Sequence, residues 1–183
     1  MTNVPPQYAW LAKLDPLPRM VAEGLKLLGT VETPGPKSNP TIMSWREEIK
    51  KSGGVNVDGY SADSVPWCGL LMAVLAVRAG KAPPRYPLWA LNWSGFGQPG
   101  NQPCLGDVLT FVRSGGGHVA LYIAEDKAAY HVLGGNQSDS VSITRIDKKR
   151  LNSVRRPTVQ FAPAPTAIPY VVAASGKLST NEA

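Results

Sequence analysis

One apolar stretch decides the fold. Residues 64–80 read SVPWCGLLMAVLAVRAG, and this pattern predicts a helix over residues 66–80 that is apolar on nearly every side. Ser64 is suited to cap the start of the helix, and Gly80 to end it. A helix without a polar face has to be enclosed by other elements, so we expect it to be the central helix of the core. It places Cys68 at its second or third position.

Two helices are predicted before this one. In residues 19–28 apolar side chains recur at helical spacing, and Gly29 ends the pattern. Asn39-Pro40 is typical of a helix start, because an N-cap residue is followed by proline at the first helical position. This second helix should end at Gly53. Residues 1–17 contain several prolines and are expected to form an extended N-terminal segment.

The periodicity changes from helical to strand-like after Gly106. The candidate strands are residues 107–113, 118–124, 129–133, 141–146 and 154–156. Short antiparallel strands that follow a set of helices indicate an α+β fold. Residues 81–105 form a long irregular stretch containing Trp89, Trp93 and Phe96, which we expect to be ordered and to line a surface. We expect one domain over residues 18–160 and a flexible C-terminal tail over residues 161–183, which is rich in Pro, Ala and Ser.

The composition fits one globular domain. The chain has 183 residues, of which 43% are hydrophobic and 17% charged, values ordinary for a domain with a real core. Two cysteines are too few for a disulfide scaffold, and no Cys/His cluster has zinc spacing, so we expect no metal or other cofactor. The apolar run at residues 70–77 is far shorter than the about 20 residues that span a bilayer. No secretory signal is recognisable, so synthesis in the cytoplasm without a signal peptide is expected.

The net charge of +6 favours a polyanionic partner. The basic residues are scattered, apart from short runs at residues 148–150 and 155–156, and no nucleic-acid-binding motif accompanies them. We therefore expect an acidic surface as partner and no nucleic acid.

A cysteine and a histidine are the candidate reactive pair. The exposed N–H groups and the dipole at a helix N-terminus favour the thiolate of Cys68, which is the reactive form. A cysteine nucleophile also needs a base. His118 follows three glycines and opens a strand, whereas His131 lies inside an apolar strand, where a structural role is more natural. A lone cysteine at a helix start is more often inert, and for Cys104, in a loop without a histidine, a structural role is favoured.

The third member of the site follows from strand pairing. If residues 118–124 and 129–133 form a hairpin, His118 lies opposite Gly135 or Asn136, depending on the register. In the second register the amide oxygen of Asn136 could accept a hydrogen bond from the imidazole N–H. His131 would then point to the other face of the sheet.

Several motifs together resemble one enzyme family. They are Pro66-Trp67-Cys68-Gly69, Gly106-Asp107-Val108 at a strand start, Gly117-His118-Val119-Ala120 and Leu133-Gly134-Gly135-Asn136-Gln137. Their order and spacing resemble the CHAP/NlpC-type cysteine peptidases, in particular a branch common in phages and prophages that pairs a Trp-Cys motif with a late Gly-Gly-Asn-Gln. The resemblance covers about residues 10 to 157.

The resemblance implies a papain-like α+β fold, in which a cysteine-bearing helix packs on an antiparallel sheet. By position, Cys68 is the nucleophile, His118 the base and Asn136 the orienting residue. Many CHAP members have a carboxylate two residues before that asparagine, where this chain has Gly134. Tyr60 resembles a tyrosine that some NlpC-type enzymes place near the oxyanion.

Further residues are candidates for binding the substrate. With Tyr60 they are Trp67, Trp89, Trp93 and Gln137, although core packing is the expected role of at least one of the tryptophans.

The implied activity is hydrolysis of an amide bond in peptidoglycan, in the periplasm or cell wall after release or delivery. An amidase and a stem-peptide endopeptidase both fit, as do an endolysin and a delivered antibacterial effector with an immunity protein as partner. Two alternatives stay open: a non-catalytic phage structural or wall-binding protein that retains the fold, and an acyltransferase that uses the same triad.

Overall fold

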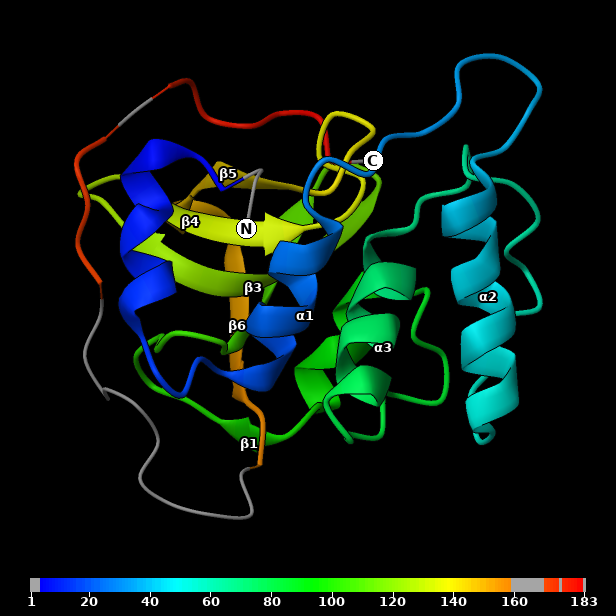
Figure 1. The fold of residues 1–183 in the computed structure, drawn as a ribbon. Coiled ribbons are helices and arrows are strands. Elements are labelled where there is room, and N and C mark those ends of the chain that lie inside the picture. Colours follow the sequence, from blue (N-terminus) through cyan, green and yellow to red (C-terminus); the bar gives the residue numbers. More distant parts are fainter. Residues whose placement is uncertain (1–3, 159–169, 175, 183) are drawn as a thin grey trace.

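Helices and an antiparallel sheet form two layers (Figure 1). The computed structural model describes residues 4–158, 170–174 and 176–182. The helices are η1 (Pro6–Lys13), α1 (Arg19–Leu27), α2 (Pro40–Ser52), α3 (Cys68–Arg78), η2 (Ala90–Gly95) and η3 (Lys148–Arg150). The strands are β1 (Gln98–Pro99), β2 (Val108–Arg113), β3 (Gly116–Glu125), β4 (Ala129–Gly134), β5 (Ser142–Asp147) and β6 (Leu151–Arg156). The α+β fold expected from the sequence is confirmed.

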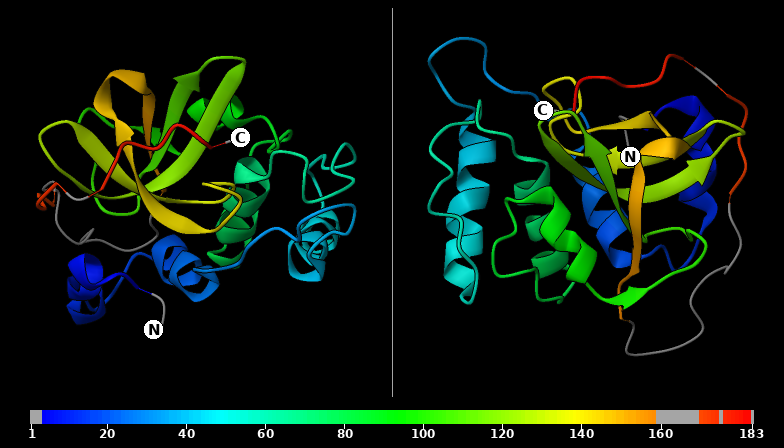
Figure 2. Two further views of the ribbon diagram at one scale, coloured as in Figure 1. Left: turned by 90° about the horizontal axis from the view of Figure 1, so that it is seen from above. Right: turned by 180° about the vertical axis from the view of Figure 1, so that it is seen from behind.

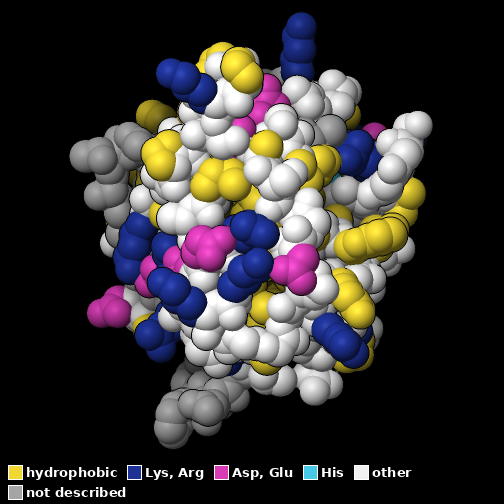
Figure 3. Space-filling view, turned by 90° about the vertical axis from the view of Figure 1, so that its right-hand side faces the viewer, with side chains coloured by type: hydrophobic (Ala, Val, Ile, Leu, Met, Phe, Trp, Pro, Cys, Tyr) yellow, Lys and Arg dark blue, Asp and Glu magenta, His cyan; other side chains and the backbone are white. Residues whose placement is uncertain are grey.

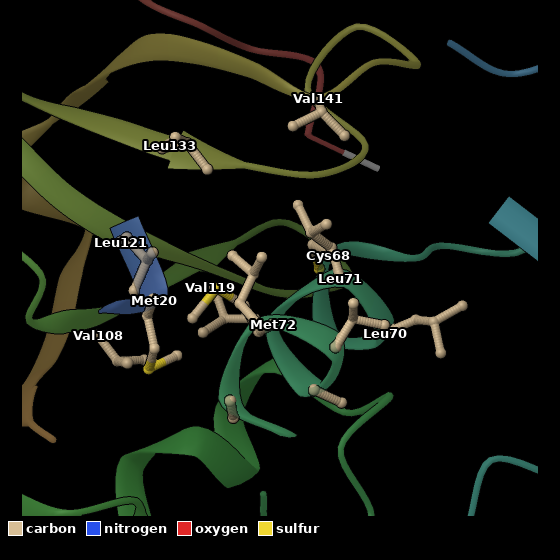
Figure 4. Close-up of a cluster of buried hydrophobic side chains, with 14 of the residues drawn as sticks. Met20, Cys68, Leu70, Leu71, Met72, Val108, Val119, Leu121, Leu133 and Val141 are labelled. Carbon is tan, nitrogen blue, oxygen red and sulfur yellow. The ribbon is translucent and has the colours of Figure 1, made fainter. Parts of the chain in front are cut away.

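Helix α3 lies at the centre, as its apolar sequence predicts. Every side chain from Cys68 to Ala76 is buried, and Figure 4 shows several of them among apolar side chains from α1 and the sheet. The expected start of the helix was wrong by two residues. Trp67 is the N-cap and makes no side-chain capping bond, so Cys68 is the first helical residue and Ser64 does not cap the helix.

The two earlier helices were also predicted correctly. The Asn39 side chain caps α2 by accepting from the amide of Thr41 at 2.8 Å, and the helix ends at Gly53 with a φ of 74°.

Helix α2 packs on α3 rather than on the sheet (Figure 1), and Arg78 of α3 donates two hydrogen bonds to Glu48 of α2. On the face that carries α2, Lys and Arg side chains alternate with acidic ones (Figure 3), so the positive charge is not gathered there.

The six strands run antiparallel in the order β1-β6-β2-β3-β4-β5. Both faces of the sheet centre are buried. In β3, Val119 and Leu121 face the helices, whereas Ala120 and Tyr122 join a second apolar cluster on the opposite face. This double burial accounts for the nearly continuous apolar run in β3. The five expected strands are present, and only the two-residue strand β1 was not predicted.

The β3–β4 hairpin has the second of the two expected registers near the site. Leu121 pairs with Leu133 and Tyr122 with Val132, and a register shift follows between Tyr122 and Ala124. If β4 continued beyond Gly134 in this register, Asn136 would lie opposite His118. However, β4 ends at Gly134.

Both ends of the described chain pack on the same core. Residues Pro6–Lys13 form a 3-10 helix that buries Tyr8 and Leu11, so the expected extended N-terminal segment was wrong for these residues. The ring of Trp10 stacks on Tyr170 at a centroid distance of 4.3 Å. Of the expected flexible tail, residues 170–174 and 176–182 contact the rest of the protein, while residues 161–169, 175 and 183 lie outside the described part. The domain limits at residues 18 and 160 stay a prediction.

None of the helices in the described ranges is long and apolar enough to cross a bilayer.

Candidate active site

Cys68 lies where the first turn of α3 meets the start of β3. Its side chain is 3% exposed. The backbone amides of Val119 in β3 and Gly69 in α3 interact with its sulfur. Because Val119 directly follows His118, the structure brings the cysteine and the histidine to the same end of β3, and no hydrogen bond joins the two among the described residues.

Burial raises the pKa of the Cys68 thiol, although the amides of Val119 and Gly69 and the charge of Arg113 act in the opposite direction. The helix position alone had suggested an easily formed thiolate. In this closed state desolvation outweighs the helix terminus and the thiol form is favoured.

His118 is fully buried and is held by Gln137. The imidazole Nε2 lies 3.1 Å from Gln137 Oε1. The Gln137 Nε2 group donates to the carbonyl oxygen of Ser142 at 2.7 Å and, more weakly, to that of Val132 at 3.4 Å. Carbonyl oxygens only accept hydrogen bonds, so the orientation of the amide is determined: its nitrogen faces the carbonyls and its oxygen faces the imidazole.

This arrangement determines the tautomer of the neutral imidazole. Gln137 Oε1 can only accept, so His118 Nε2 carries the hydrogen and donates it. The other ring nitrogen, Nδ1, then carries a lone pair. Nδ1 is buried and has no hydrogen-bond partner among the described residues. A buried ring nitrogen with a free lone pair is what a general base requires.

Burial also lowers the pKa of His118 to about 4, against the raising effects of the Gln137 hydrogen bond and the charge of Glu182. The imidazole is therefore neutral near pH 7, the state in which it can accept a proton.

The hydrogen bond expected from Asn136 is made by Gln137 instead. The chain leaves β4 at Gly134 and turns through left-handed backbone at Asn136, whose φ is 55°. This turn directs the next residue, Gln137, back toward β3. Asn136 is 2% exposed, and its Oδ1 has no partner among the described residues. The assignment of Gln137 to substrate binding was also wrong, because its amide is used to hold His118.

The two glycines before Asn136 make this return possible. A Cβ on Gly134 would lie 2.7 Å from Gln137 Oε1 and 2.9 Å from the Ala120 side chain, and a Cβ on Gly135 would lie 2.5 Å from the Trp67 ring. The missing side chains at Gly134 and Gly135 let Gln137 pack against the sheet. A pair of adjacent glycines is the feature of the sequence that could have indicated this close packing.

Three of the residues expected to contact substrate are core residues instead. Trp67, Trp93 and Tyr60 are each 0% exposed. The Trp67 indole donates to Glu32 at 2.6 Å and the Trp93 indole to the carbonyl oxygen of Pro87 at 2.9 Å. Indoles buried with a satisfied N–H stabilise the core and are not accessible to a ligand.

One exposed apolar cluster flanks the site. It consists of Tyr86, Trp89 and Leu91, which are 46%, 74% and 41% exposed. The loop that carries them packs on the glycines next to Cys68 and His118. A Cβ on Gly69 would lie 2.1 Å from the carbonyl oxygen of Pro87, and a Cβ on Gly117 would lie 2.6 Å from Leu91. The expected binding role of Trp89 stays a prediction, and its position is compatible with it.

His131 has the structural role expected for it. It is fully buried, with its Nδ1 2.7 Å from the Tyr8 hydroxyl and its Nε2 2.8 Å from Asp126. Asp126 also accepts from Arg145, and these contacts lower its pKa well below the usual range. In the part of the chain that the structure describes, no group of three or more His, Cys, Asp and Glu side chains is placed to hold a metal ion.

Comparisons with known proteins show a weak structural likeness. No protein-family model matches the chain, and no curated protein matches it in sequence. Among solved structures, RipD from Mycobacterium tuberculosis superposes with a TM-score of 0.42 at 19% identity, over 74% of this chain and 92% of RipD. RipD is described as a non-catalytic NlpC/p60 domain protein adapted to peptidoglycan binding.

Proposed function

We propose that the chain is a cysteine hydrolase that cleaves an amide bond of peptidoglycan, with Cys68 as nucleophile and His118 as base. One observation carries the chemistry: Gln137 holds the neutral imidazole in the tautomer that leaves Nδ1 free as a proton acceptor. Peptidoglycan as substrate rests on the motif resemblance and on the net charge of +6.

The reaction would proceed in two steps. His118 Nδ1 takes the thiol proton while Cys68 attacks the amide carbonyl, and the backbone N–H of Cys68 with a neighbouring donor stabilises the oxyanion. The imidazolium then protonates the leaving amine, and a thioester forms at Cys68. Water, deprotonated by Nδ1, hydrolyses the thioester and restores the thiol. Gln137 acts as a positioning residue throughout, because it never contacts the reacting atoms.

A cysteine comparison tests the proposal. Cys68→Ala should abolish the release of soluble fragments from purified cell wall, while Cys104→Ala, which removes the same atom from a loop cysteine, should keep it. Both variants should melt cooperatively. Mass spectrometry of the fragments decides between the two bonds, because a free lactyl group indicates an amidase and a new peptide amine indicates an endopeptidase. Wall digestion by Cys68→Ala equal to that by the unmodified protein would contradict the proposal.

A non-catalytic wall-binding protein is the second candidate, and the burial of the reactive pair favours it. Cys68 is 3% and His118 0% exposed, so no substrate reaches them in this state. In that case neither cysteine variant would alter co-sedimentation with cell wall, and no fragment would be released by any of the three proteins.

A further inference from the structure

The C-terminal segment, residues 176–182, crosses the strands of the sheet (Figure 2, left). Two of the hydrogen bonds that hold its backbone run between main-chain groups. The amide of Ser179 donates to the carbonyl oxygen of Arg145 in β5 at 2.8 Å. The amide of Ser138 donates to the carbonyl oxygen of Asn181 at 2.9 Å. Because Ser138 directly follows Gln137, the second contact places the segment beside the residue that holds His118.

The segment inserts one carboxylate into the protein. Glu182 is 1% exposed, and its two oxygens accept from the two terminal nitrogens of Arg150 at 3.0 and 2.8 Å. This bidentate geometry is the one in which a guanidinium recognises a carboxylate most strongly. Burial alone would raise the pKa of Glu182, but hydrogen bonds from Arg150 and Ser179 and the charge of Arg150 lower it below its usual value. The carboxylate is therefore bound as an anion.

Arg150 lies next to the reactive histidine. Its Nε donates to the carbonyl oxygen of Val112 in β2 at 3.2 Å, and Val112 pairs with Gly117, the residue before His118. The charges of both Arg150 and Glu182 influence His118. A guanidinium whose charge acts on the base can bind an anionic group of a molecule whose amide bond lies at the site.

We propose that Arg150 forms a subsite for a carboxylate-bearing peptide beside His118, and that residues 176–182 occupy this subsite as an internal ligand. This proposal rests on the proposed function where it assigns the external occupant, a free carboxylate of a peptidoglycan stem peptide. Displacement of the segment would expose the site and present Arg150 to the substrate.

The first experiment needs no hydrolysis. The rate at which iodoacetamide modifies Cys68, measured by peptide mapping so that Cys104 is scored separately, reports the accessibility of the site. Glu182→Gln should increase this rate about tenfold, because it removes one charge of a buried pair. Glu47→Gln, which neutralises an exposed carboxylate on α2, is the matched control and should not change it.

A shortened chain that ends at residue 175 extends this test. It should be modified at least as fast as Glu182→Gln, and a synthetic peptide of residues 176–183 should restore protection. The added change Arg150→Gln should weaken that peptide about tenfold or more, whereas Lys149→Gln, at an exposed neighbouring site, should not. Equal modification rates in the unmodified protein, Glu182→Gln and the shortened chain would overturn the proposal. If the shortened chain does not fold, the rate of Cys68 modification in full-length Glu182→Gln, compared with that in the unmodified protein, still tests the proposal.

The second experiment identifies the external ligand. Muropeptides with free and with amidated carboxylates are compared as substrates of the shortened chain. We expect a higher kcat/KM for the free acids, and Arg150→Gln should remove this preference while Lys149→Gln keeps it. An unchanged preference in Arg150→Gln would overturn the substrate assignment. If no protein hydrolyses any muropeptide, the proposed hydrolase function fails, and the modification and peptide-binding results still decide whether Arg150 is a carboxylate subsite.

Discussion

At the scale of single residues, the site depends on the orientation of one amide. The oxygen and nitrogen of a glutamine side chain are similar in shape, but Gln137 has carbonyl oxygens on one side, which force its own oxygen toward His118. The direction of this hydrogen bond could not be predicted from the sequence. The positions of Cys68 at a helix start and of His118 near a strand start could be predicted, because both starts are recognisable from local patterns. Their catalytic roles stay a prediction.

Replacement of Gln137 tests its positioning role. Gln137→Ala should lower kcat by about 10²-fold or more with little change in KM, since the imidazole loses the partner that selects its tautomer. The pH profile of kcat should change as well, because the Gln137 bond raises the pKa of His118. Gln98→Ala, an exposed glutamine in β1, is the control. A Gln137→Ala protein with an unaltered kcat and pH profile would show that the bond is structural only.

At the scale of elements, sequence patterns predicted the three α-helices and five strands well. Most of them bury one face whose spacing is visible in the sequence, and α3 and β3, which are buried all round, are visible as apolar runs. The predictions from periodicity were wrong where the chain leaves regular secondary structure. Asn136 was placed by extending β4, but the strand ends two residues earlier and left-handed backbone follows. The 3-10 helix η1 was missed because its prolines suggested an extended chain.

The contact between α3 and the loop over it is tight enough to test. A Cβ on Gly69 would lie 2.1 and 3.0 Å from the backbone oxygens of Pro87 and Leu88, so the loop would have to move. Gly69→Ala should lower the free energy of unfolding by about 2 kcal/mol and also reduce activity, as judged by urea denaturation and wall digestion. Gly59→Ala, where the added methyl meets open space, should do neither. Equal stability of the two variants would contradict the packing argument.

At the scale of the whole molecule, polar contacts connect the two ends of the described chain to the sheet. Tyr8 of η1 reaches His131 in β4, and Asp126 joins His131 to Arg145 in β5. Arg145 in turn donates to the carbonyl oxygen of Gly176. This network could not be predicted from the sequence, because its members are far apart along the chain and none belongs to a recognisable motif.

Removal of one hydroxyl tests how much the network stabilises the fold. Tyr8→Phe leaves the Nδ1 of a buried histidine without its partner, which should lower the free energy of unfolding by about 1–3 kcal/mol. Tyr86→Phe, at a half-exposed ring beside the site, should change it by less than about 0.5 kcal/mol. Urea denaturation measures both. A Tyr8→Phe protein as stable as the unmodified chain would show that the hydroxyl contributes nothing net.

The exposed indole beside the site has a practical consequence. Trp45, Trp67 and Trp93 are at most 1% exposed, and Trp10 is partly buried with its ring stacked on Tyr170, whereas Trp89 is 74% exposed. Collisional quenchers such as iodide will therefore act mainly on the emission of Trp89. A wall fragment bound over this loop would shield that indole, so the protein contains its own optical reporter of occupancy.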